Sequence, residues 1–417
     1  MIPIIEKIKD RIVYVSKDPM RALGLETLIP NFYIVSYEDS YILNFIKNTY
    51  SIKRNESNPK QRGDIASILS DTMVQEYISS IPEPISFMFF KPTRGGEEML
   101  NNQRILNTTY ALNKKFEDKI ELVKLFEKMI PKSKVINLET ENYNNLKNIF
   151  GPKFVIQFSH GHSGNTTFFI SNEEEYNSLQ EEYPKRISKA VQFIEGEYFT
   201  VNGVVTKKGI VVGNLSKQIT GVKNLTDFAG STVGNNWDTK LEIRVKEQIK
   251  LLTQNIGNIL ETYGYLGMFG IDIIFDGSNI FLIEINPREN ASIPVFTQVQ
   301  IENGFIPFKL IHILEFLNID YSLDVKKEND FIFQDIQLTN LVVRKKDNQK
   351  NKILFNGVYN SNLEKIREGY NISSLKNNNE ILILSKNEMS TTNEEIGRIQ
   401  KRGNISSDEI SLITDNI

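Results

Sequence analysis

Residues 270–290 read GIDIIFDGSNIFLIEINPREN, and this is the most informative stretch of the chain. Two apolar runs flank the sequence Asp-Gly-Ser-Asn, which favours a tight turn, so the pattern predicts a β-hairpin. Glu284 and Asn286 are two positions apart, and their side chains therefore point to one face of the second strand. Because strand pairing brings the first strand alongside, we expect Asp272 to join them and three oxygen ligands to converge.

The three oxygen ligands suit a hard divalent cation. Mg²⁺ takes carboxylate and carbonyl oxygens together with phosphate oxygens, and Mn²⁺ is an alternative ion at such a site. Arg288 follows directly, and its planar guanidinium suits a phosphoryl group during transfer. A surface hairpin with an ordinary ion pair would use the same residue types. The metal interpretation is favoured because Ile283 and Ile285 alternate with the ligand-type residues, which predicts one core face and one ligand face.

The same segment resembles the metal-binding signature of the ATP-grasp superfamily. In that family an acidic residue is followed twelve positions later by a glutamate, and then by asparagine and arginine at intervals of two. This spacing is kept by Asp272, Glu284, Asn286 and Arg288. The resemblance implies that the first three bind Mg²⁺ and that Arg288 acts catalytically on the phosphates of ATP.

The resemblance extends back over residues 154–170, FVIQFSHGHSGNTTFFI, which look like a strand, a phosphate-covering loop and a second strand. It implies that backbone N–H groups of the loop cradle the β- and γ-phosphates, at Ser163, Gly164, Asn165 and Thr166. The family usually has a lysine on the incoming strand, where this chain has Gln157, and a basic residue is common at Asn165. We therefore expect reduced phosphate affinity.

Two lysines are further candidates. The pair Asp118-Lys119 matches the position of the family's other phosphate lysine, which makes Lys119 a nucleotide-binding residue by resemblance. Lys217 lies where family members contact the acyl phosphate, and it is a candidate for stabilising developing negative charge. Downstream, the run Asn235-Asn236-Trp237 fits either substrate recognition or a plain surface turn.

Residues 190–205, AVQFIEGEYFTVNGVV, resemble the hinge that holds adenine. The resemblance implies that backbone groups of Gln192 and Ile194 bond to the adenine edge and that Phe193 lines its pocket. A ribose-binding glutamate is usual where this chain has Tyr198, and Glu197 stands one position earlier as the candidate.

The length of 417 residues predicts two to three domains in a mixed α/β fold. We expect an N-terminal Rossmann-like α/β domain at 1–115, a central ATP-grasp domain of α+β type with two subdomains at 116–325, its lid at about 150–205, and a small β-rich domain at 326–417. The remaining expected elements are strands at 12–15, 32–35 and 85–90, a helix at 38–48, a helix at 116–130, strands at 153–158 and 167–171, a helix at 172–180, a hairpin of 198–205 with 209–213, a helix at 240–263, a hairpin of 269–275 with 280–285, and short strands beyond 330 followed by a helix near Asn393.

Composition excludes several classes of protein. The net charge of −3, with 49 basic residues spread along the chain, argues against a nucleic-acid or anionic-membrane surface. The absence of cysteine removes disulfides, thiolate zinc sites and thiol nucleophiles, and fits a cytoplasmic location. Neither a signal peptide nor a run of about 18 apolar residues is present, so no membrane span is expected.

The motifs together favour an ATP-dependent, ADP-forming carboxylate–amine ligase that acts on a small molecule such as an amino acid. The N-terminal α/β region and the β-rich tail resemble the biotin-carboxylase-like branch of the superfamily. Biotin carboxylase itself is disfavoured, because that enzyme needs a glutamate four positions after the arginine and this chain has Ser292. A nucleotide-binding sensor or scaffold with weak turnover remains the alternative, and a ligase that modifies proteins or nucleic acids has less support. The sequence leaves the substrates and the oligomeric state open, a homodimer included.

Overall fold

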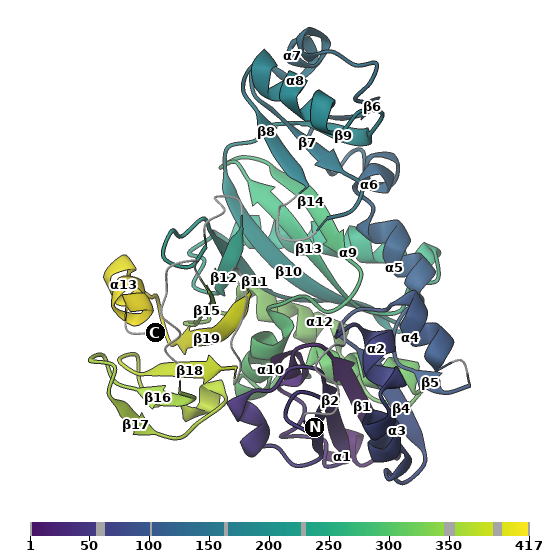
Figure 1. Cartoon of the computed structure of the whole chain (residues 1–417), viewed down its shortest axis with the longest axis vertical. Coiled ribbons are helices and arrows are strands. Elements are labelled where there is room, and N and C mark those ends of the chain that lie inside the picture. Colours follow the sequence, from purple (N-terminus) through teal and green to yellow (C-terminus); the bar gives the residue numbers. More distant parts are fainter. Residues whose placement is uncertain are drawn as a thin grey trace.

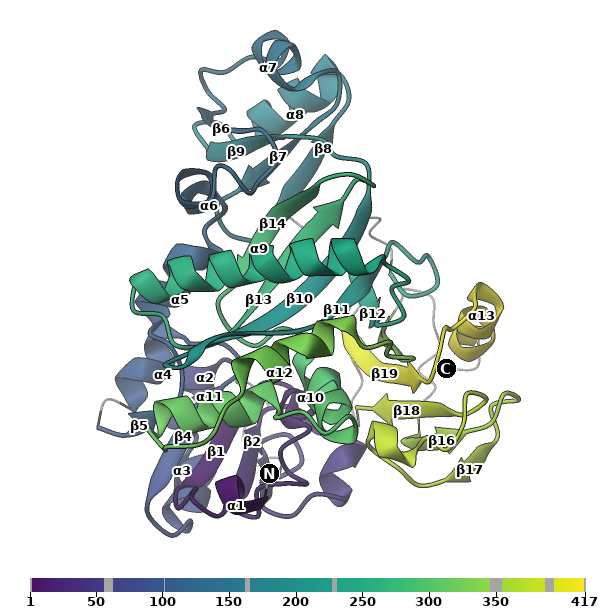
Figure 2. The ribbon, with the colours of Figure 1, turned by 180° about the vertical axis from the view of Figure 1, so that it is seen from behind.

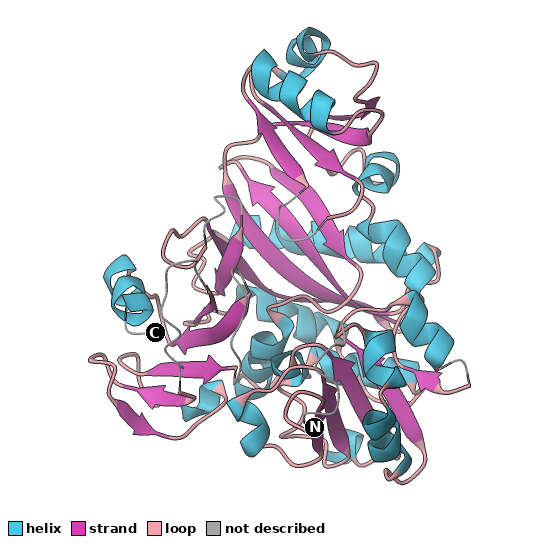
Figure 3. Ribbon diagram, in the orientation of Figure 1, coloured by secondary structure: helices cyan, strands magenta, loops and turns pink. Residues whose placement is uncertain are grey.

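The computed structural model describes residues 2–55, 63–100, 102–161, 166–226, 231–345, 355–386 and 394–415. Within these residues the strands form a five-stranded, a four-stranded and a ten-stranded sheet. In Figure 1 the N-terminal sheet lies at the bottom, the four-stranded sheet at the top, and the large sheet between them, with its C-terminal strands at the left. Figure 3 shows helices against all three sheets, so the predicted mixed α/β class is confirmed.

The N-terminal sheet is parallel, in the order β3-β2-β1-β4-β5. Its elements are α1 (Ile2–Ile5), β1 (Arg11–Ser16), η1 (Pro19–Ala22), β2 (Phe32–Ser36), η2 (Tyr41–Asn44), β3 (Thr49–Ser51), α2 (Ile65–Ser70), α3 (Thr72–Ser79), β4 (Ile85–Phe89), α4 (Arg94–Met99) and β5 (Arg104–Ile105). The predicted strands are confirmed, and their continuous burial fits a parallel sheet covered on both faces. The predicted helix at 38–48 is wrong. Only the 3-10 turn η2 forms there, and the chain leaves it through Asn48 at φ 55°.

The four-stranded sheet is antiparallel, in the order β6-β9-β7-β8. Its elements are β6 (Ser133–Asn137), α7 (Tyr143–Phe150), β7 (Phe154–Phe158), β8 (Thr167–Ile170), α8 (Glu173–Glu182) and β9 (Ile187–Gln192). Alternate residues of β7, such as Phe154 and Ile156, pack on the two helices. The residues between them therefore face the other way. The predicted strands and the helix after them are confirmed, and Asn172 begins α8 by accepting from the N–H of Glu175 at 2.9 Å.

The large sheet is antiparallel, in the order β14-β13-β10-β11-β12-β15-β19-β18-β16-β17. Its strands are β10 (Glu197–Thr206), β11 (Gly209–Thr220), β12 (Thr232–Asn236), β13 (Gly267–Phe275), β14 (Ile280–Asn286), β15 (Thr339–Arg344), β16 (Gly357–Tyr359), β17 (Lys365–Arg367), β18 (Ile381–Ser385) and β19 (Glu395–Lys401). Both predicted hairpins are confirmed. In the second, Asp276 holds the turn by accepting from the N–H groups of Ser278 and Asn279 at 2.8 and 2.7 Å.

The C-terminal strands continue this sheet, because β12 pairs with β15. Helix α13 (Ser407–Asp415) and the 3-10 turn η4 (Ile372–Ser374) complete this part of the fold. The predicted helix was placed near Asn393, a residue that lies outside the described residues. The described chain that follows forms β19 and not a helix, so this part of the prediction is wrong. Pairing on both sides, with β15 and β18, favours the strand over local helix preference.

The two faces of the large sheet are covered differently. Helix α9 (Ile243–Thr262) lies across one face, as Figure 2 shows, and packs Ile249, Ile256 and Leu260 on apolar strand residues. Burying each of these side chains contributes about 1.5–3 kcal/mol. On the other face, α10 (Ile293–Glu302), α11 (Phe308–Phe316), α12 (Val325–Asn329) and η3 (Asp330–Phe333) join the core that also contains residues of β1 and β2. The rest of that second face is free to carry polar side chains.

The helix predicted at 116–130 is instead two helices, α5 (Tyr110–Glu117) and α6 (Lys119–Leu125). Asp118 interrupts the run with an extended backbone and caps α6 by accepting from the N–H of Ile120 at 2.8 Å. The apolar residues Phe126 and Ile130 are buried as the pattern predicts, although they follow the helix. The break makes Lys119 the first residue of α6.

None of the helices in the described residues is long and apolar enough to cross a membrane.

His312 of α11 yields a test of the core. Its Nδ1 accepts from the N–H of Met268 at 3.0 Å, and its Nε2 then donates to the carbonyl of Leu106 at 2.6 Å. Burial lowers its pKa from 6.5 to about 4. The unfolded chain takes up a proton below pH 6.5 while the folded chain does not, so the free energy of unfolding should fall by about 3 kcal/mol between pH 6.5 and 4.

We expect His312→Gln, which keeps a donor and an acceptor but does not titrate, to lose less unfolding free energy over that pH interval than the wild type does. Urea unfolding at pH 7, 6, 5 and 4 measures the difference. Identical losses for the two proteins would show that His312 is not held neutral by the fold.

Candidate functional site

A cavity of about 1220 Å³ lies between the four-stranded sheet and the polar part of the large sheet. Strand alternation builds both walls: β7 and β9 turn Gln157 and Lys189 into it, while β10 and β13 contribute Thr200 and Asp272. The structure brings these sequence-predicted residues together on its lining: Lys119, Gln157, Thr166, Gln192, Phe193, Ile194, Asp272, Glu284, Asn286 and Arg288.

Other sequence-predicted residues are not placed there. Ser163, Gly164 and Asn165 lie outside the described residues. Lys217 and Glu197 are not on the cavity lining; they form an ion pair with each other and are both about half exposed. Their neighbours Gln218 and Tyr198 line the cavity instead, because alternate residues of β11 and β10 face opposite ways.

Asp272 is the centre of the polar wall, opposite Glu284 in the β13–β14 register. It accepts from Thr200 Oγ1 at 2.7 Å, from Gln218 Nε2 at 2.8 Å and from Asn286 Nδ2 at 3.3 Å. Burial and the neighbouring Glu284 raise its pKa to about 6. The predicted pairing of Asp272 with Glu284 is thus confirmed, whereas Asn286 turns its amide nitrogen and not its oxygen toward Asp272. The sequence analysis did not identify Thr200 and Gln218 as site residues. The signal that could have found them is the alternation of side chains along the strands next to Asp272, which places every second residue on the cavity face.

One detail of the hairpin differs from the prediction. The register shifts between Asp272 and Ile273, so Ile283 is an extra residue on β14. Ile283 therefore lines the cavity with Glu284 instead of joining the core, which Leu282 and Ile285 do. The prediction that Ile283 is a core residue is wrong, because it assumed strict alternation of side chains along β14 and the bulge interrupts that alternation.

Arg288 is held from several directions. Its Nε bonds to Glu117 Oε1 at 2.9 Å, and its Nη2 donates to Asn286 Oδ1 at 3.0 Å. Lys91 binds the second oxygen of Glu117 at 2.6 Å. Burial raises the pKa of Glu117, but Arg288 and Lys91 outweigh it and hold that pKa below its ordinary value. The guanidinium also lies 5.3 Å from the ring centre of Phe90, so it is preorganised at the edge of the cavity.

Two lysines lie inside the cavity close to the carboxylates. Lys119 Nζ pairs with Glu284 Oε2 at 2.8 Å, and its side chain is 6% exposed. Lys189 of β9 is 1% exposed, and burial together with the nearby Lys119 lowers its pKa to about 8. The sequence analysis missed Lys189. The alternation of β9, with Ala190 in the core, was the signal that could have found it.

The donor set fits a hard cation that is shared with a ligand. Asp272 and Glu284 supply two carboxylates on one wall, and Asn286 lies beside them with its Nδ2 toward Asp272 and its Oδ1 toward Arg288. In the described part of the chain, no group of three or more His, Cys, Asp or Glu could hold a metal ion. Mg²⁺ commonly uses one or two carboxylates with phosphate oxygens and water, which these residues match.

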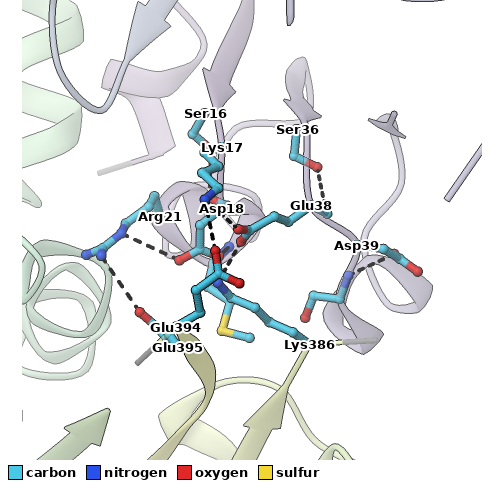
Figure 4. A network of polar contacts seen from close by, with 12 residues as sticks. Ser16, Lys17, Asp18, Arg21, Ser36, Glu38, Asp39, Lys386, Glu394 and Glu395 are labelled. Atoms are coloured by element: carbon cyan, nitrogen blue, oxygen red, sulfur yellow. Dashed lines mark hydrogen bonds and ion pairs between the residues drawn. The ribbon is translucent and has the colours of Figure 1, made fainter. Parts of the chain in front are cut away.

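A second cavity of about 430 Å³ adjoins the first, and Arg21, Phe90, Lys91 and Arg344 line both. It lies beyond the carboxyl ends of β1, β2 and β4, where the strand order of the parallel sheet reverses, and open α/β sheets bind ligands at such a point. Figure 4 shows the charged residues around it. Those labelled there that line the cavity are Lys17, Asp18, Arg21, Glu38, Lys386, Glu394 and Glu395, and Asp64, Lys91 and Arg344 line it as well.

Buried ion pairs order this second cavity. Arg398 bonds to Asp18 and to Glu395, each at 2.6 Å, and Lys386 bonds to Glu38 at 2.6 Å. Arg21 Nε lies 3.5 Å from Asp18, while its Nη1 is buried and has no hydrogen-bond partner in the described structure. Its guanidinium lies 4.7 Å from the ring centre of Phe90, the ring that Arg288 also contacts.

Comparisons with known proteins agree with this geometry. Residues 116–292 match a family model described as an ATP-grasp domain. The chain is 25% identical over 246 residues, 55% of its length, to the carbamoyl phosphate synthase large chain of Clostridium acetobutylicum, and it spans 22% of the length of that relative.

Solved structures with the same fold include N5-carboxyaminoimidazole synthetase from Staphylococcus aureus complexed with ADP, at TM-score 0.60 and 11% identity over 98% of this chain and 97% of that one. Another is a biotin carboxylase–ATP complex from Campylobacter jejuni, at TM-score 0.64 and 11% identity over 95% and 88% of the two chains. Residues 116–292 of this chain thus match the ATP-grasp domain family, and the chain shares its fold with these solved structures.

Proposed function

We propose that this chain is an ATP-dependent ligase that activates a carboxylate as an acyl phosphate and joins it to an amine, with release of ADP and phosphate. The observation that carries the proposal is the arrangement of Asp272, Glu284, Asn286 and Arg288 on one wall of a single cavity. Solved neighbours are complexed with ADP or ATP, which supports a nucleotide in this cavity.

The nucleotide is oriented by the two ends of the cavity. Backbone groups of Gln192 and Ile194 are the candidates for the adenine edge, and Phe193 lines the pocket around the ring. Lys119 and Thr166 lie toward the phosphates, and Asp272 and Glu284 with Asn286 are proposed to hold Mg²⁺ or Mn²⁺. The bound cation would neutralise charge on the β- and γ-phosphates.

The chain's own residues then serve two displacement steps. A carboxylate oxygen of the substrate attacks the γ-phosphorus, the bond from that phosphorus to the β,γ-bridging oxygen breaks, and ADP leaves. Arg288 is placed to stabilise charge on the transferred phosphoryl group, since Glu117 and Asn286 fix its guanidinium. The amine nitrogen next attacks the acyl carbon, phosphate leaves with the acyl oxygen, and the nitrogen loses a proton.

The second cavity is proposed to receive the carboxylate or the amine substrate. It shares Arg21, Phe90 and Lys91 with the first cavity, so a ligand in it reaches the phosphoryl group held near Arg288. Its lining mixes acidic and basic side chains, which suits a zwitterion such as an amino acid. Ser292 is buried and bonds to Asn290 Oδ1 at 2.6 Å, so it does not supply a base for bicarbonate.

A nucleotide-binding sensor or scaffold remains the second candidate function. Gln157 favours it, since a neutral side chain stands where the family usually has a phosphate-binding lysine. ADP release that a substrate stimulates separates the ligase from the sensor. The use of ATP and the absence of cysteine favour a cytoplasmic location, and a homodimer is one oligomeric state consistent with this proposal.

Glu284→Gln tests the metal role. We expect substrate-dependent ADP formation from Mg·ATP to fall at least ~100-fold, because the amide cannot replace the anionic oxygen that the cation and phosphates need. The assay pairs a panel of amino acids and small carboxylates with amines. The matched control is Glu368→Gln, which removes a carboxylate from an exposed pair with Lys365 and should leave the rate unchanged.

ADP formation that is equal in Glu284→Gln and in the wild type would contradict the metal assignment. ATP binding without ADP release for any substrate pair would favour the sensor.

Arg21→Met tests the second cavity. Loss of a guanidinium that binds a substrate carboxylate should raise the KM for that substrate about 10- to 100-fold and leave the KM for ATP within ~2-fold. Arg402→Met, which removes a partly exposed pair with Glu302, is the control. Equal rises in both KM values would instead indicate a general disturbance of the fold.

A further inference from the structure

Lys189 stands directly opposite Gln157 in the antiparallel pairing of β9 with β7. Directly opposed residues of an antiparallel pair share one face of the sheet, with Cβ atoms about 4.5–5.5 Å apart. Both side chains line the large cavity. A lysine at 189 therefore reaches the same region of that cavity as a lysine at 157 would.

The charge around Lys189 is incomplete without a ligand. The side chain is 1% exposed, and no hydrogen bond or ion pair to its Nζ is found in the described parts of the chain. The carboxylate whose charge acts on Lys189, Glu284, is already bonded to Lys119 at 2.8 Å, so two buried lysines depend on one carboxylate. Burying an unpaired ammonium is costly unless an anion completes its environment.

We propose that Lys189 binds the α- and β-phosphates of the nucleotide and replaces, from the neighbouring strand, the cation that Gln157 does not supply. The assignment rests on the proposed nucleotide site. If Glu284 holds a cation, Lys119 and Lys189 would both face the polyphosphate, which carries enough negative charge to pair with both lysines.

The neutral residue at 157 fits this exchange of positions. Like charges directly opposite each other on one face of a sheet are destabilising. A lysine at 157 beside Lys189 would place two buried ammonium groups together, with Lys119 close by. Positions 157 and 189 together therefore hold one lysine, which can lie on either β7 or β9.

The test removes the lysine at position 189 and, in a second variant, places a lysine at position 157 on the neighbouring strand. Calorimetry then measures the dissociation constants of ATP, ADP and adenosine for each variant. Lys189→Gln should weaken ATP and ADP about 10- to 100-fold and leave adenosine within ~2-fold, as loss of a charged hydrogen bond predicts. The double variant Gln157→Lys/Lys189→Gln should recover ATP binding to within ~3-fold of the wild type. Lys134→Gln, an exposed lysine of the same sheet paired with Glu141, is the control and should bind as the wild type does.

Unchanged ATP affinity in Lys189→Gln would overturn the inference, as would equal weakening of ATP and adenosine or a double variant that recovers nothing while melting at the wild-type temperature. Wild-type protein that does not bind Mg·ATP would refute the proposed function and this inference together. Wild-type binding and turnover with an insensitive Lys189→Gln would refute this inference alone.

Discussion

The pairing of β13 with β14 is the constraint on which the site depends. It sets Asp272 opposite Glu284, and the bulge at Ile283 keeps Leu282 and Ile285 in the core while the carboxylates face the cavity. The opposite face of the same sheet packs on α9, and the apolar side chains of the strands are buried against that helix. A one-residue change of register would exchange the two faces and remove the ligand set from the cavity.

Charge balance inside the cavity follows from that geometry. Asp272 is surrounded by neutral donors, and Arg288 and Lys91 share Glu117. Lys119 is paired with Glu284, and the buried Lys189 lies close to the same carboxylate, so this end of the cavity holds two lysines beside the two carboxylates of the hairpin. Fixed dipoles and charges of this kind stabilise a developing negative charge without reorganising during the reaction.

The parallel N-terminal sheet and the C-terminal strands meet at the second cavity. Asp18 follows β1 and pairs with Arg398 of β19. Glu38 follows β2 and pairs with Lys386, which follows β18. Buried ion pairs of this type contribute little net stability but disfavour other relative positions, because a separated charge would remain unpaired. The network therefore positions Arg21 beside Phe90, at the opening between the two cavities.

Local pattern was sufficient for the hairpin, for α9 and for strands β7 and β8, because period two, period 3.6 and turn residues act over a few positions. It was insufficient at three places. The helix expected at 116–130 is interrupted at Asp118, because that residue caps α6. The chain after residue 393 forms β19, because strands pair with it on both sides. Ile283 lies outside the core, because a bulge interrupts the alternation of β14.

The ligand-type residues and their spacing could be read from the sequence because they lie on one hairpin, but the pairing of Asp272 with Glu284 also needs the bulge at Ile283, which the turn does not set. Only the tertiary structure decided which side chains from other strands join them. Lys189, Thr200 and Gln218 enter the cavity, whereas Lys217 does not, because facing direction depends on which strand lies alongside and on which face the helices cover. Contacts between residues far apart in the chain have no signature in a single sequence.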